Sequence, residues 1–195
     1  MLYASGEHVP TMKSVQAHVI TLVGLPGSGK TWVGRALAER LGWRFVDTDQ
    51  VVVSRLGQSI AEIVAQRGWA MFRREEQGAL LAALGWKHVV IASGGGSVES
   101  TANREAMATG SQVIWLRAQP GCLLNRLAAD TNERPLLQAD TTHRLAELRR
   151  CREPLYAGLA TCCIDTDSLD VGQVVARIVT VLTTKDDGAG YEAAD

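Results

Sequence analysis

The stretch GLPGSGKT at residues 24–31 has the GxxxxGK[ST] pattern of a phosphate-binding loop. In such a loop the glycines let the backbone curl so that successive N–H groups point at phosphate oxygens. Lys30 is expected to reach the β- and γ-phosphates, and the Thr31 hydroxyl to ligate magnesium. The alternative interpretation is a plain glycine turn. The nucleotide contacts expected from this loop come from Gly27, Ser28, Gly29, Lys30 and Thr31.

The two flanks of the loop favour the phosphate-binding interpretation. Residues 18–23 are apolar and β-branched, which is typical of a buried strand. Residues 32–41 carry apolar side chains at helical spacing, so a helix is expected there, and its N-terminus adds the positive end of the helix dipole. A strand, a glycine loop and a helix in this order are the context that the motif requires.

Two carboxylates follow the second expected strand. Asp47 ends this strand, and Asp49 comes two residues later, so in an extended segment both side chains would face the same side. We expect one carboxylate, Asp47, to serve a magnesium ion together with Thr31, and the other to meet a substrate hydroxyl. A solvated acidic turn is the alternative. Asp165 and Asp167 look similar but have no glycine or arginine neighbours, so we interpret them as structural.

Three further features point to an anionic ligand. The glycines at residues 94–96 bring bare backbone to the end of the third expected strand, unless they form only a flexible turn. Arg73 and Glu76 share one helix face at i, i+3, where a surface salt bridge is the alternative. Arg152 ends an expected helix, and there the alternative is a cation that stabilises a helix C-terminus.

The elements that must position these residues alternate regularly along the chain. Ligands of parallel sheets lie beyond the carboxyl ends of the strands, where the residues named above are expected. Five apolar strands that alternate with helices predict a parallel sheet covered on both faces. The strands are expected at residues 18–23, 43–46, 89–92, 112–116 and 162–164, and the helices at 32–41, 50–56, 60–84 with an interruption at Gly68, 101–107, 120–128, 143–156 and 171–182.

Composition limits the functional classes. The net charge of −1 gives no electrostatic case for nucleic acid or a membrane surface, and no run of 18 apolar residues is present. The four cysteines lack metal-ligand or disulfide spacing, so reduced thiols and a cytoplasmic location are expected. One domain at residues 16–184 is expected, with a disordered leader at 1–15 and a flexible tail at 185–195.

With these motifs in place, the sequence closely resembles the shikimate kinases. The matching stretches, in the order and spacing of that family, are GLPGSGKT at 24–31, DTD at 47–49, FRRxE at 72–76, GGG at 94–96, RPLL at 134–137 and REPLY at 152–156. The resemblance covers roughly residues 18–182. It implies a three-layer α/β/α P-loop kinase with a five-stranded parallel sheet in the order 2-3-1-4-5 and a mobile lid at about residues 129–139.

The resemblance also implies a reaction: the γ-phosphate of ATP is transferred, with Mg²⁺, to the 3-hydroxyl of shikimate in aromatic amino acid biosynthesis. It implies a monomer that acts on small molecules, with no nucleic acid or membrane partner. Lys30, Asp49 and Arg134 would be catalytic, and Glu76 would support Arg73. Substrate would be bound by Asp49, Arg73, Gly94, Gly95, Gly96 and Arg152, the phosphates also by Arg134 on the lid, the adenine by Arg126, and magnesium by Thr31 and Asp47.

One position departs from the family, because Gly68 is followed by Trp69 where shikimate kinases usually have Glu. Two other functions share parts of the pattern. A kinase for another small polyol acid, such as gluconate, would keep the phosphate loop but need not keep Arg73, Gly95 and Arg152 together. A catalytically inactive nucleotide-binding regulator would show damage at the loop lysine or the two carboxylates, and none is seen.

Overall fold

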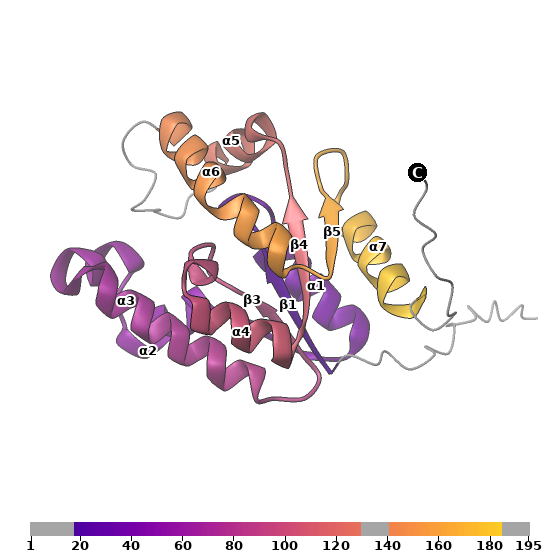
Figure 1. Ribbon diagram of the computed structural model, residues 1–195, viewed down its shortest axis with the longest axis horizontal. Helices are drawn as coiled ribbons and strands as arrows, with labels where there is room; N and C mark the ends of the chain where they lie inside the picture. Colours follow the sequence, from indigo (N-terminus) through magenta and orange to yellow (C-terminus); the bar gives the residue numbers. More distant parts are fainter. Residues whose placement is uncertain (1–17, 130–140, 185–195) are drawn as a thin grey trace, which may run out of the picture.

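The computed structural model describes residues 18–129 and 141–184, and its centre is a parallel five-stranded sheet (Figure 1). The strands lie in the order β2-β3-β1-β4-β5, and every neighbouring pair is parallel. This is the expected topology. The bounds are β1 Val19–Val23, β2 Arg44–Asp47, β3 Val89–Ala92, β4 Gln112–Arg117 and β5 Cys162–Asp165.

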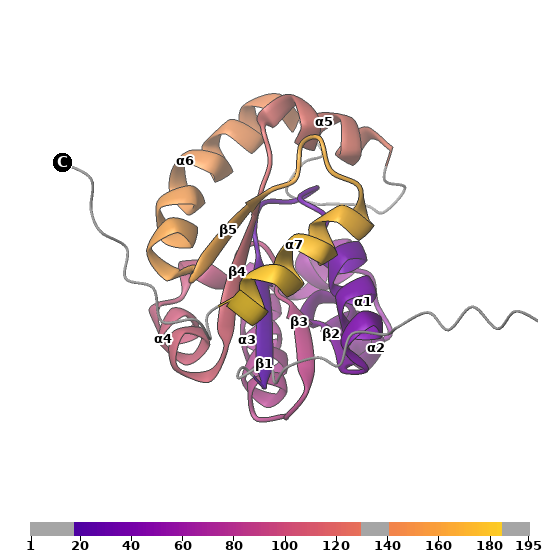
Figure 2. The ribbon, with the colours of Figure 1, turned by 90° about the vertical axis from the view of Figure 1, so that its right-hand side faces the viewer.

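Helices cover both faces of the sheet, which gives the three layers expected from the sequence. Figure 2 shows α1 and α7 on one side of the strands, with α4 and α6 on the other. The helices are α1 Lys30–Leu41, α2 Thr48–Leu56, α3 Ile60–Leu84, α4 Thr101–Gly110, α5 Pro120–Ala128, α6 Thr141–Leu159 and α7 Val171–Thr184, with a 3-10 turn η1 at Ser97–Glu99.

The strand residues separate two hydrophobic cores by simple alternation. On β1, Ile20 and Leu22 point into the core shared with α1 and α7, whereas Val19 and Val23 point into the core shared with α3, α5 and α6. All five residues of β1 are buried. A strand buried on both faces has no polar side to expose, and this explains its continuous apolar sequence.

A third, smaller cluster joins α2 to the first half of α3. Its buried members are Val52, Ile63 and Phe72. Ser59 and Glu62 have the sequence spacing of a capping box, and the box is present at the start of α3: the Ser59 hydroxyl accepts the Glu62 N–H and the Glu62 carboxylate accepts the Ser59 N–H. Gly68 has φ 77° and ψ 165°, so it kinks α3 where the sequence predicted an interruption.

The register of the sheet gathers the strand ends at one edge. Leu22 of β1 pairs with Ala92 of β3, which in turn pairs with Asp47 of β2. The phosphate loop, the two carboxylates and the glycines at 94–96 all lie at or just after these paired residues, so the sheet brings them together as expected.

Among the described helices, none is long and apolar enough to cross a membrane.

The helices extend the expected ones by a few residues at most, and one of these extensions corrects an interpretation. Arg152 does not end its helix, because α6 continues to Leu159 with Pro154 inside it. Its position therefore excludes the alternative of a cation at a helix C-terminus. The predicted leader and tail, and the lid apart from Ala129, lie outside the described residues.

Candidate active site

The phosphate loop lies between β1 and α1 and has the curled backbone that the glycines predicted. Gly24, Gly27 and Gly29 have φ values of 149°, 80° and 94°, which side chains rarely tolerate. A Cβ at Gly24 would lie 2.5 Å from the Leu116 carbonyl oxygen, so the loop also passes very close to β4. The Ser28 N–H donates to the Leu25 carbonyl at 3.1 Å and closes the turn.

The Lys30 ammonium lies over the loop rather than pointing away from it. It donates to the carbonyl oxygens of Gly24 at 2.9 Å and Leu25 at 3.0 Å, and it lies 3.5 Å from the Ser28 hydroxyl. A cation held above a ring of backbone N–H groups forms a site for a phosphate chain. The structure therefore places Lys30 where the motif predicted it.

The two residues predicted to hold magnesium are in contact. The Thr31 hydroxyl donates to Asp47 Oδ2 at 2.7 Å, while Asp47 Oδ1 accepts the N–H groups of Asp49 and Gln50. Hydroxyl and carboxylate oxygens are the hard ligands that Mg²⁺ prefers, and it usually takes only one or two from the protein beside water and phosphate. The described residues contain no cluster of three or more acidic, His or Cys ligands.

Asp49 reaches the site by a different geometry from the one expected. The segment after Asp47 is not extended: α2 begins at Thr48, and Asp49 lies in its first turn with Asp47 as the N-cap. The N-cap hydrogen bonds to Asp47 hold this turn against the end of β2. Both carboxylates face the site as predicted, but the reason given for it, an extended segment from Asp47 to Asp49, was wrong.

The environment of Asp49 disfavours its charge. Although the residue as a whole is partly exposed, its Oδ1 atom is buried and has no hydrogen-bond partner. Burial first, and then the negative charges of Glu76 and Asp47, raise the pKa of Asp49 from 3.8 to about 7, while Lys30 and Arg73 act in the opposite direction. The side chain is therefore poised to accept a hydrogen bond, or a proton, from a ligand hydroxyl near neutral pH.

Two of the three glycines at 94–96 are needed because a charged side chain fills the space beside them, and the third is in van der Waals contact with an arginine. A Cβ at Gly94 would lie 2.5 Å from Asp49 Oδ1, and one at Gly96 would overlap the Arg73 guanidinium. At Gly95 it would lie 3.5 Å from Arg152 Nη1. The backbone at these three positions thus forms a surface on which a carboxylate and two guanidinium groups, from three different helices, converge.

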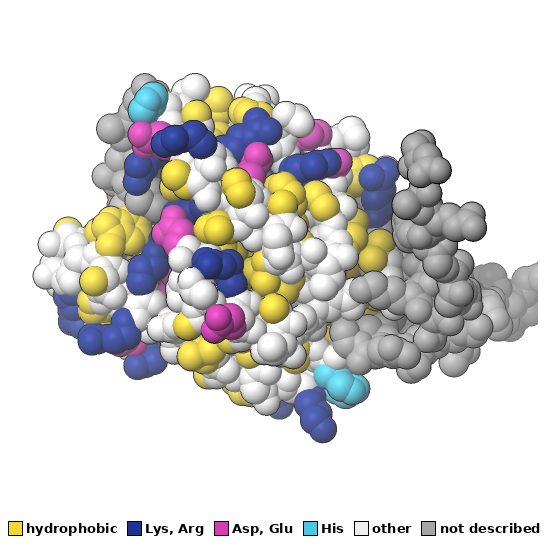
Figure 3. Space-filling model, viewed as in Figure 1, with side chains coloured by type: hydrophobic (Ala, Val, Ile, Leu, Met, Phe, Trp, Pro, Cys, Tyr) yellow, Lys and Arg dark blue, Asp and Glu magenta, His cyan; other side chains and the backbone are white. Residues whose placement is uncertain are grey.

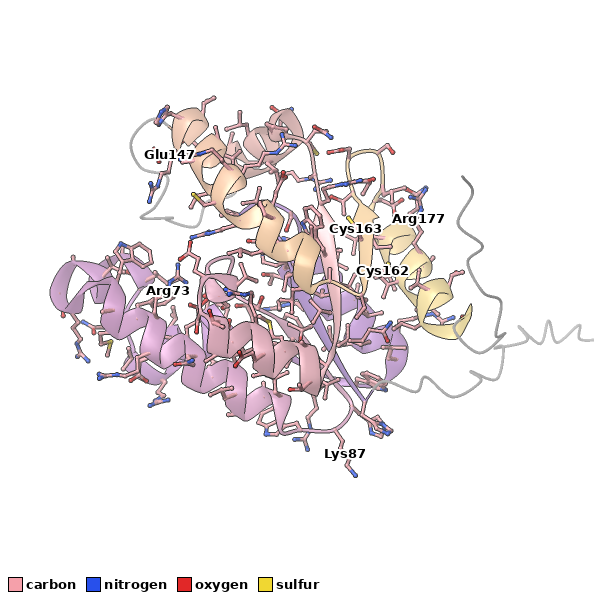
Figure 4. All side chains as sticks on the ribbon, viewed as in Figure 1. Arg73, Lys87, Glu147, Cys162, Cys163 and Arg177 are labelled. Carbon is pink, nitrogen blue, oxygen red and sulfur yellow. The ribbon has the colours of Figure 1, made fainter. Side chains whose placement is uncertain are left out.

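Arg73 is held by an ion pair at this surface. Its Nη1 donates to Glu76 Oε2 at 2.6 Å, and Ser97 donates to the other oxygen of the same carboxylate at 2.9 Å. The Glu76 side chain is only 1% exposed and that of Arg73 is 28% exposed, so this is not a surface salt bridge. Figure 4 shows Arg73 on the side of α3 that faces α6.

Arg152 reaches the site from α6 and is almost fully buried. Its Nε donates to Glu99 Oε1 at 2.8 Å, with 3% of the Arg152 side chain and 48% of the Glu99 side chain exposed. Tyr156, one turn later, donates from its hydroxyl to the Gly95 carbonyl at 2.6 Å. Glu99 and Tyr156 were not predicted as site residues, although Glu99 comes three residues after Gly96 and Tyr156 ends the REPLY stretch.

One of the predicted nucleotide contacts, Arg126, does not enter this cluster. Arg126 of α5 donates to the Thr166 hydroxyl at 2.9 Å and to the Thr166 carbonyl at 2.5 Å, which places it beside the loop after β5. Asp165 in the same region forms a bidentate pair with Arg117, as expected of a structural residue, although here an arginine neighbour does exist. Arg134 lies outside the described residues.

The surface between α3 and α6 presents both signs of charge (Figure 3). A cavity of about 310 Å³ opens beside Arg73, Gly96 and Glu99. This arrangement offers fixed cations for an anionic group, backbone N–H groups beside them, and one carboxylate next to the phosphate loop. It can hold a small acid with its hydroxyls toward a nucleotide phosphate.

Comparisons with known proteins agree with this geometry. The family model described as shikimate kinase matches residues 26–183. Shikimate kinases of Symbiobacterium thermophilum and Moorella thermoacetica are 46% and 42% identical, over 84% of this chain in each case and over 95% and 93% of theirs. The structure of the Acinetobacter baumannii shikimate kinase in complex with shikimate superposes with a TM-score of 0.84 at 33% identity, covering 88% of this chain and 96% of that one.

A gluconokinase from Sinorhizobium meliloti is also similar in structure, with a TM-score of 0.54 and 19% identity over 86% of this chain and 92% of that one. At that identity the likeness shows the fold alone. The clustering of Arg73, Arg152 and the glycines is therefore the feature that separates the alternatives.

The raised pKa of Asp49 predicts a dependence of stability on pH. Between about pH 4 and pH 7 the folded protein retains a proton on Asp49 that the unfolded chain loses, so stability falls as the pH rises through this range. We expect the ligand-free Asp49→Asn protein to be more stable than the parent at pH 8, with the gain shrinking toward pH 5. Urea unfolding at both pH values measures it.

Asp165→Asn is the control, because the ion pair with Arg117 lowers the pKa of Asp165. Loss of a carboxylate with a lowered pKa should decrease stability at pH 8, which is the opposite sign. An Asp49→Asn protein no more stable than the parent at pH 8 would contradict the description of this site.

The ion pair between Arg152 and Glu99 predicts a second effect on stability. Glu99→Ala leaves a buried guanidinium without this partner, so the free energy of unfolding should fall by about 1–2 kcal/mol, given that Glu99 itself is half exposed. Glu147→Ala, which breaks an exposed pair with Arg144 on the same α6 helix (Figure 4), should lower the free energy of unfolding clearly less. Equal losses in the two variants would show that the Arg152 pair contributes no more than a surface pair.

Proposed function

The chain belongs to the shikimate kinase family, and from that membership we propose that it transfers the γ-phosphate of ATP to the 3-hydroxyl of shikimate. The products are shikimate 3-phosphate and ADP, and the reaction serves aromatic amino acid biosynthesis. The single observation that carries the proposal is the convergence of Asp49, Arg73 and Arg152 on the glycines at 94–96, directly beside the phosphate loop.

The nucleotide side of the site is the loop with Lys30. Backbone N–H groups at Gly27, Ser28 and Gly29 would hold the phosphates, and Lys30 would exchange its carbonyl contacts for phosphate oxygens. Thr31 and Asp47 would hold magnesium, which when bound neutralises charge on the β- and γ-phosphates. Phosphoryl transfer has a loose transition state, so positioning and charge neutralisation are the main tasks of these residues.

Asp49 would orient the acceptor. Its Oδ1 atom is buried and without a hydrogen-bond partner, so a substrate hydroxyl would satisfy it. With a pKa of about 7, the carboxylate can take the hydroxyl proton as the phosphoryl group arrives. The substrate oxygen is then bonded to the γ-phosphorus, the bond from the γ-phosphorus to the β–γ bridging oxygen is broken so that ADP leaves, and the hydroxyl proton lies on Asp49.

The carboxylate of shikimate would bind between Arg73 and Arg152. A guanidinium can bind a carboxylate with two parallel hydrogen bonds, and a second one adds charge and fixes the ring. The Gly95 backbone lies between the two arginines, next to Pro26 of the phosphate loop, so a clamped acid directs its ring toward the phosphates. Gly94 and Gly96 complete this backbone surface.

The remaining assignments stay predictions from the family resemblance. Arg134 on the expected lid would contact the phosphates and close the site against water. Arg126 of α5, whose hydrogen bonds to Thr166 place it beside the loop after β5, would contact the adenine. We also propose that the protein is a cytoplasmic monomer that binds small molecules and neither nucleic acid nor membrane.

The test of the function is release of ADP by the purified chain with MgATP and each of shikimate, gluconate and other polyol acids. We expect turnover with shikimate and little with the others, because only an acid of matching size places both its carboxylate and one hydroxyl correctly. Lys30→Ala should lower kcat by about 10²–10³ while the protein stays folded. Equal turnover of gluconate and shikimate would overturn the substrate assignment.

The clamp predicts the effect of conservative substitutions. Arg73→Ala and Arg152→Ala should each raise KM for shikimate by about 10- to 100-fold, since one charge-assisted hydrogen bond contributes roughly 1.5–3 kcal/mol. Arg→Lys should rescue only partly, because an ammonium is a point donor rather than a fork. The KM for ATP should change little.

Arg144→Lys, at an exposed arginine on the same α6 helix as Arg152, is the matched control and should leave both KM values unchanged. If Arg73→Lys and Arg152→Lys both keep the parent KM for shikimate, the two arginines do not bind the substrate carboxylate.

A further inference from the structure

Trp69 is in contact with Arg73. The Arg73 Cζ atom lies 5.3 Å from the centroid of the Trp69 ring, within the range of a cation–π interaction. The two residues are four apart on α3, and Glu76 follows three residues later, so all three lie on one helix face. The guanidinium is thus held by the Trp69 ring and the Glu76 carboxylate, and it also lies 5.5 Å from the centroid of the Phe72 ring.

The local structure fixes the indole in this place. Trp69 follows the kink at Gly68, and its ring packs edge-on against Phe72 with the centroids 5.8 Å apart. Phe72 is buried in the cluster that joins α2 to α3, and Trp69 packs at the edge of that cluster. The indole therefore has a packed support on one side and the Arg73 guanidinium on another.

A ring restrains a guanidinium without adding a second negative charge. Arg73 already has one carboxylate partner, Glu76, and Asp49 lies nearby. Glu76 occupies Nη1, so the neutral indole can limit the rotation of Arg73 while its remaining donors stay available to an incoming anion. An arginine fixed before binding loses less side-chain entropy when the ligand arrives.

We propose that Trp69 is a positioning residue for substrate binding: its ring holds Arg73 in the orientation that grips the substrate carboxylate. This inference rests on the proposed function. It concerns the ground-state grip on the acid, so it predicts a change in KM for shikimate rather than in kcat. It also predicts that the effect of Trp69 disappears when Arg73 no longer carries a charge.

The test compares Trp69→Leu, which removes the ring, with Trp69→Phe, which keeps one. Trp69→Leu should raise KM for shikimate about 3- to 10-fold, with kcat within about 2-fold and KM for ATP unchanged. Trp69→Phe should recover most of the loss. Trp86→Leu is the matched control, since the Trp86 ring stacks on Arg44 at 5.4 Å, and Arg44 begins β2 at the strand end opposite the site; it should leave all three constants unchanged.

A double-mutant cycle separates positioning from general packing. In an Arg73→Gln background, replacing Trp69 by Leu should change KM for shikimate by less than about 2-fold. Equal effects of Trp69→Leu in both backgrounds, or an unchanged KM in the single variant, would overturn the inference. Absence of turnover by the parent protein would instead reject the proposed function. If Trp69→Leu does not fold, Trp69→Met replaces it in the same cycle.

Discussion

The site depends on one steric constraint, the bare backbone at residues 94–96. Charged side chains from α2 and α3 occupy the space where the Cβ atoms of Gly94 and Gly96 would otherwise lie, and Arg152 of α6 is in van der Waals contact with Gly95. Gly94 and Gly96 are therefore needed here for close approach, since none of the three glycines is among those with positive φ. The parallel sheet brings the phosphate loop and the two carboxylates to this backbone, because the ends of β1, β2 and β3 meet at one edge.

Bringing these charges together has an electrostatic cost that falls mainly on Asp49. Glu76 is balanced by Arg73, and Glu99 balances Arg152, so both guanidinium groups are oriented before any ligand arrives. Asp49 has a buried oxygen without a partner, and burial raises its pKa to about 7. An unsatisfied polar atom of this kind is unfavourable in the free protein and favourable once a hydroxyl binds. The position of the acceptor is thus built into the ligand-free fold.

Much of this arrangement could be predicted from the sequence, because local signals carry it. The phosphate loop has a strand before it and a helix after it, and Ser59 and Glu62 have the capping-box spacing that indicates the start of α3. The position of Asp49 was predicted for a wrong reason, since the N-cap at Asp47 starts a helix where an extended segment was expected. Short segments between a strand and a helix are decided by such capping contacts, which periodicity does not reveal.

The residues that escaped prediction act through tertiary contacts. Glu99 follows the glycines closely, but only the packing of α6 against η1 brings it to Arg152, which is 53 residues away. The Gly95 carbonyl likewise receives the Tyr156 hydroxyl from 61 residues away. No spacing rule in a single sequence connects such distant positions. The role of Trp69 could not be predicted for a related reason. Its i, i+4 spacing to Arg73 is visible in the sequence, but whether its ring covers the Arg73 guanidinium depends on how α3 bends at Gly68.

Arg73 and Arg152, the two arginines proposed to bind the substrate carboxylate, lie beside different hydrophobic clusters. The glycine backbone at 94–96 therefore has to contact both of them. Arg73 lies next to Phe72, in the small cluster of α2 and α3, whereas Arg152 lies one turn before Tyr156, in the core under the sheet. A carboxylate that binds both must therefore bridge two separately packed units. The segment at 94–96 contacts Arg73 through Gly96 and Arg152 through Gly95, and the Tyr156 hydroxyl binds the Gly95 carbonyl. Because this one backbone segment touches both arginines, a shift of α3 relative to the sheet would change the Arg73 side of the clamp while the Arg152 side stays in contact with Gly95.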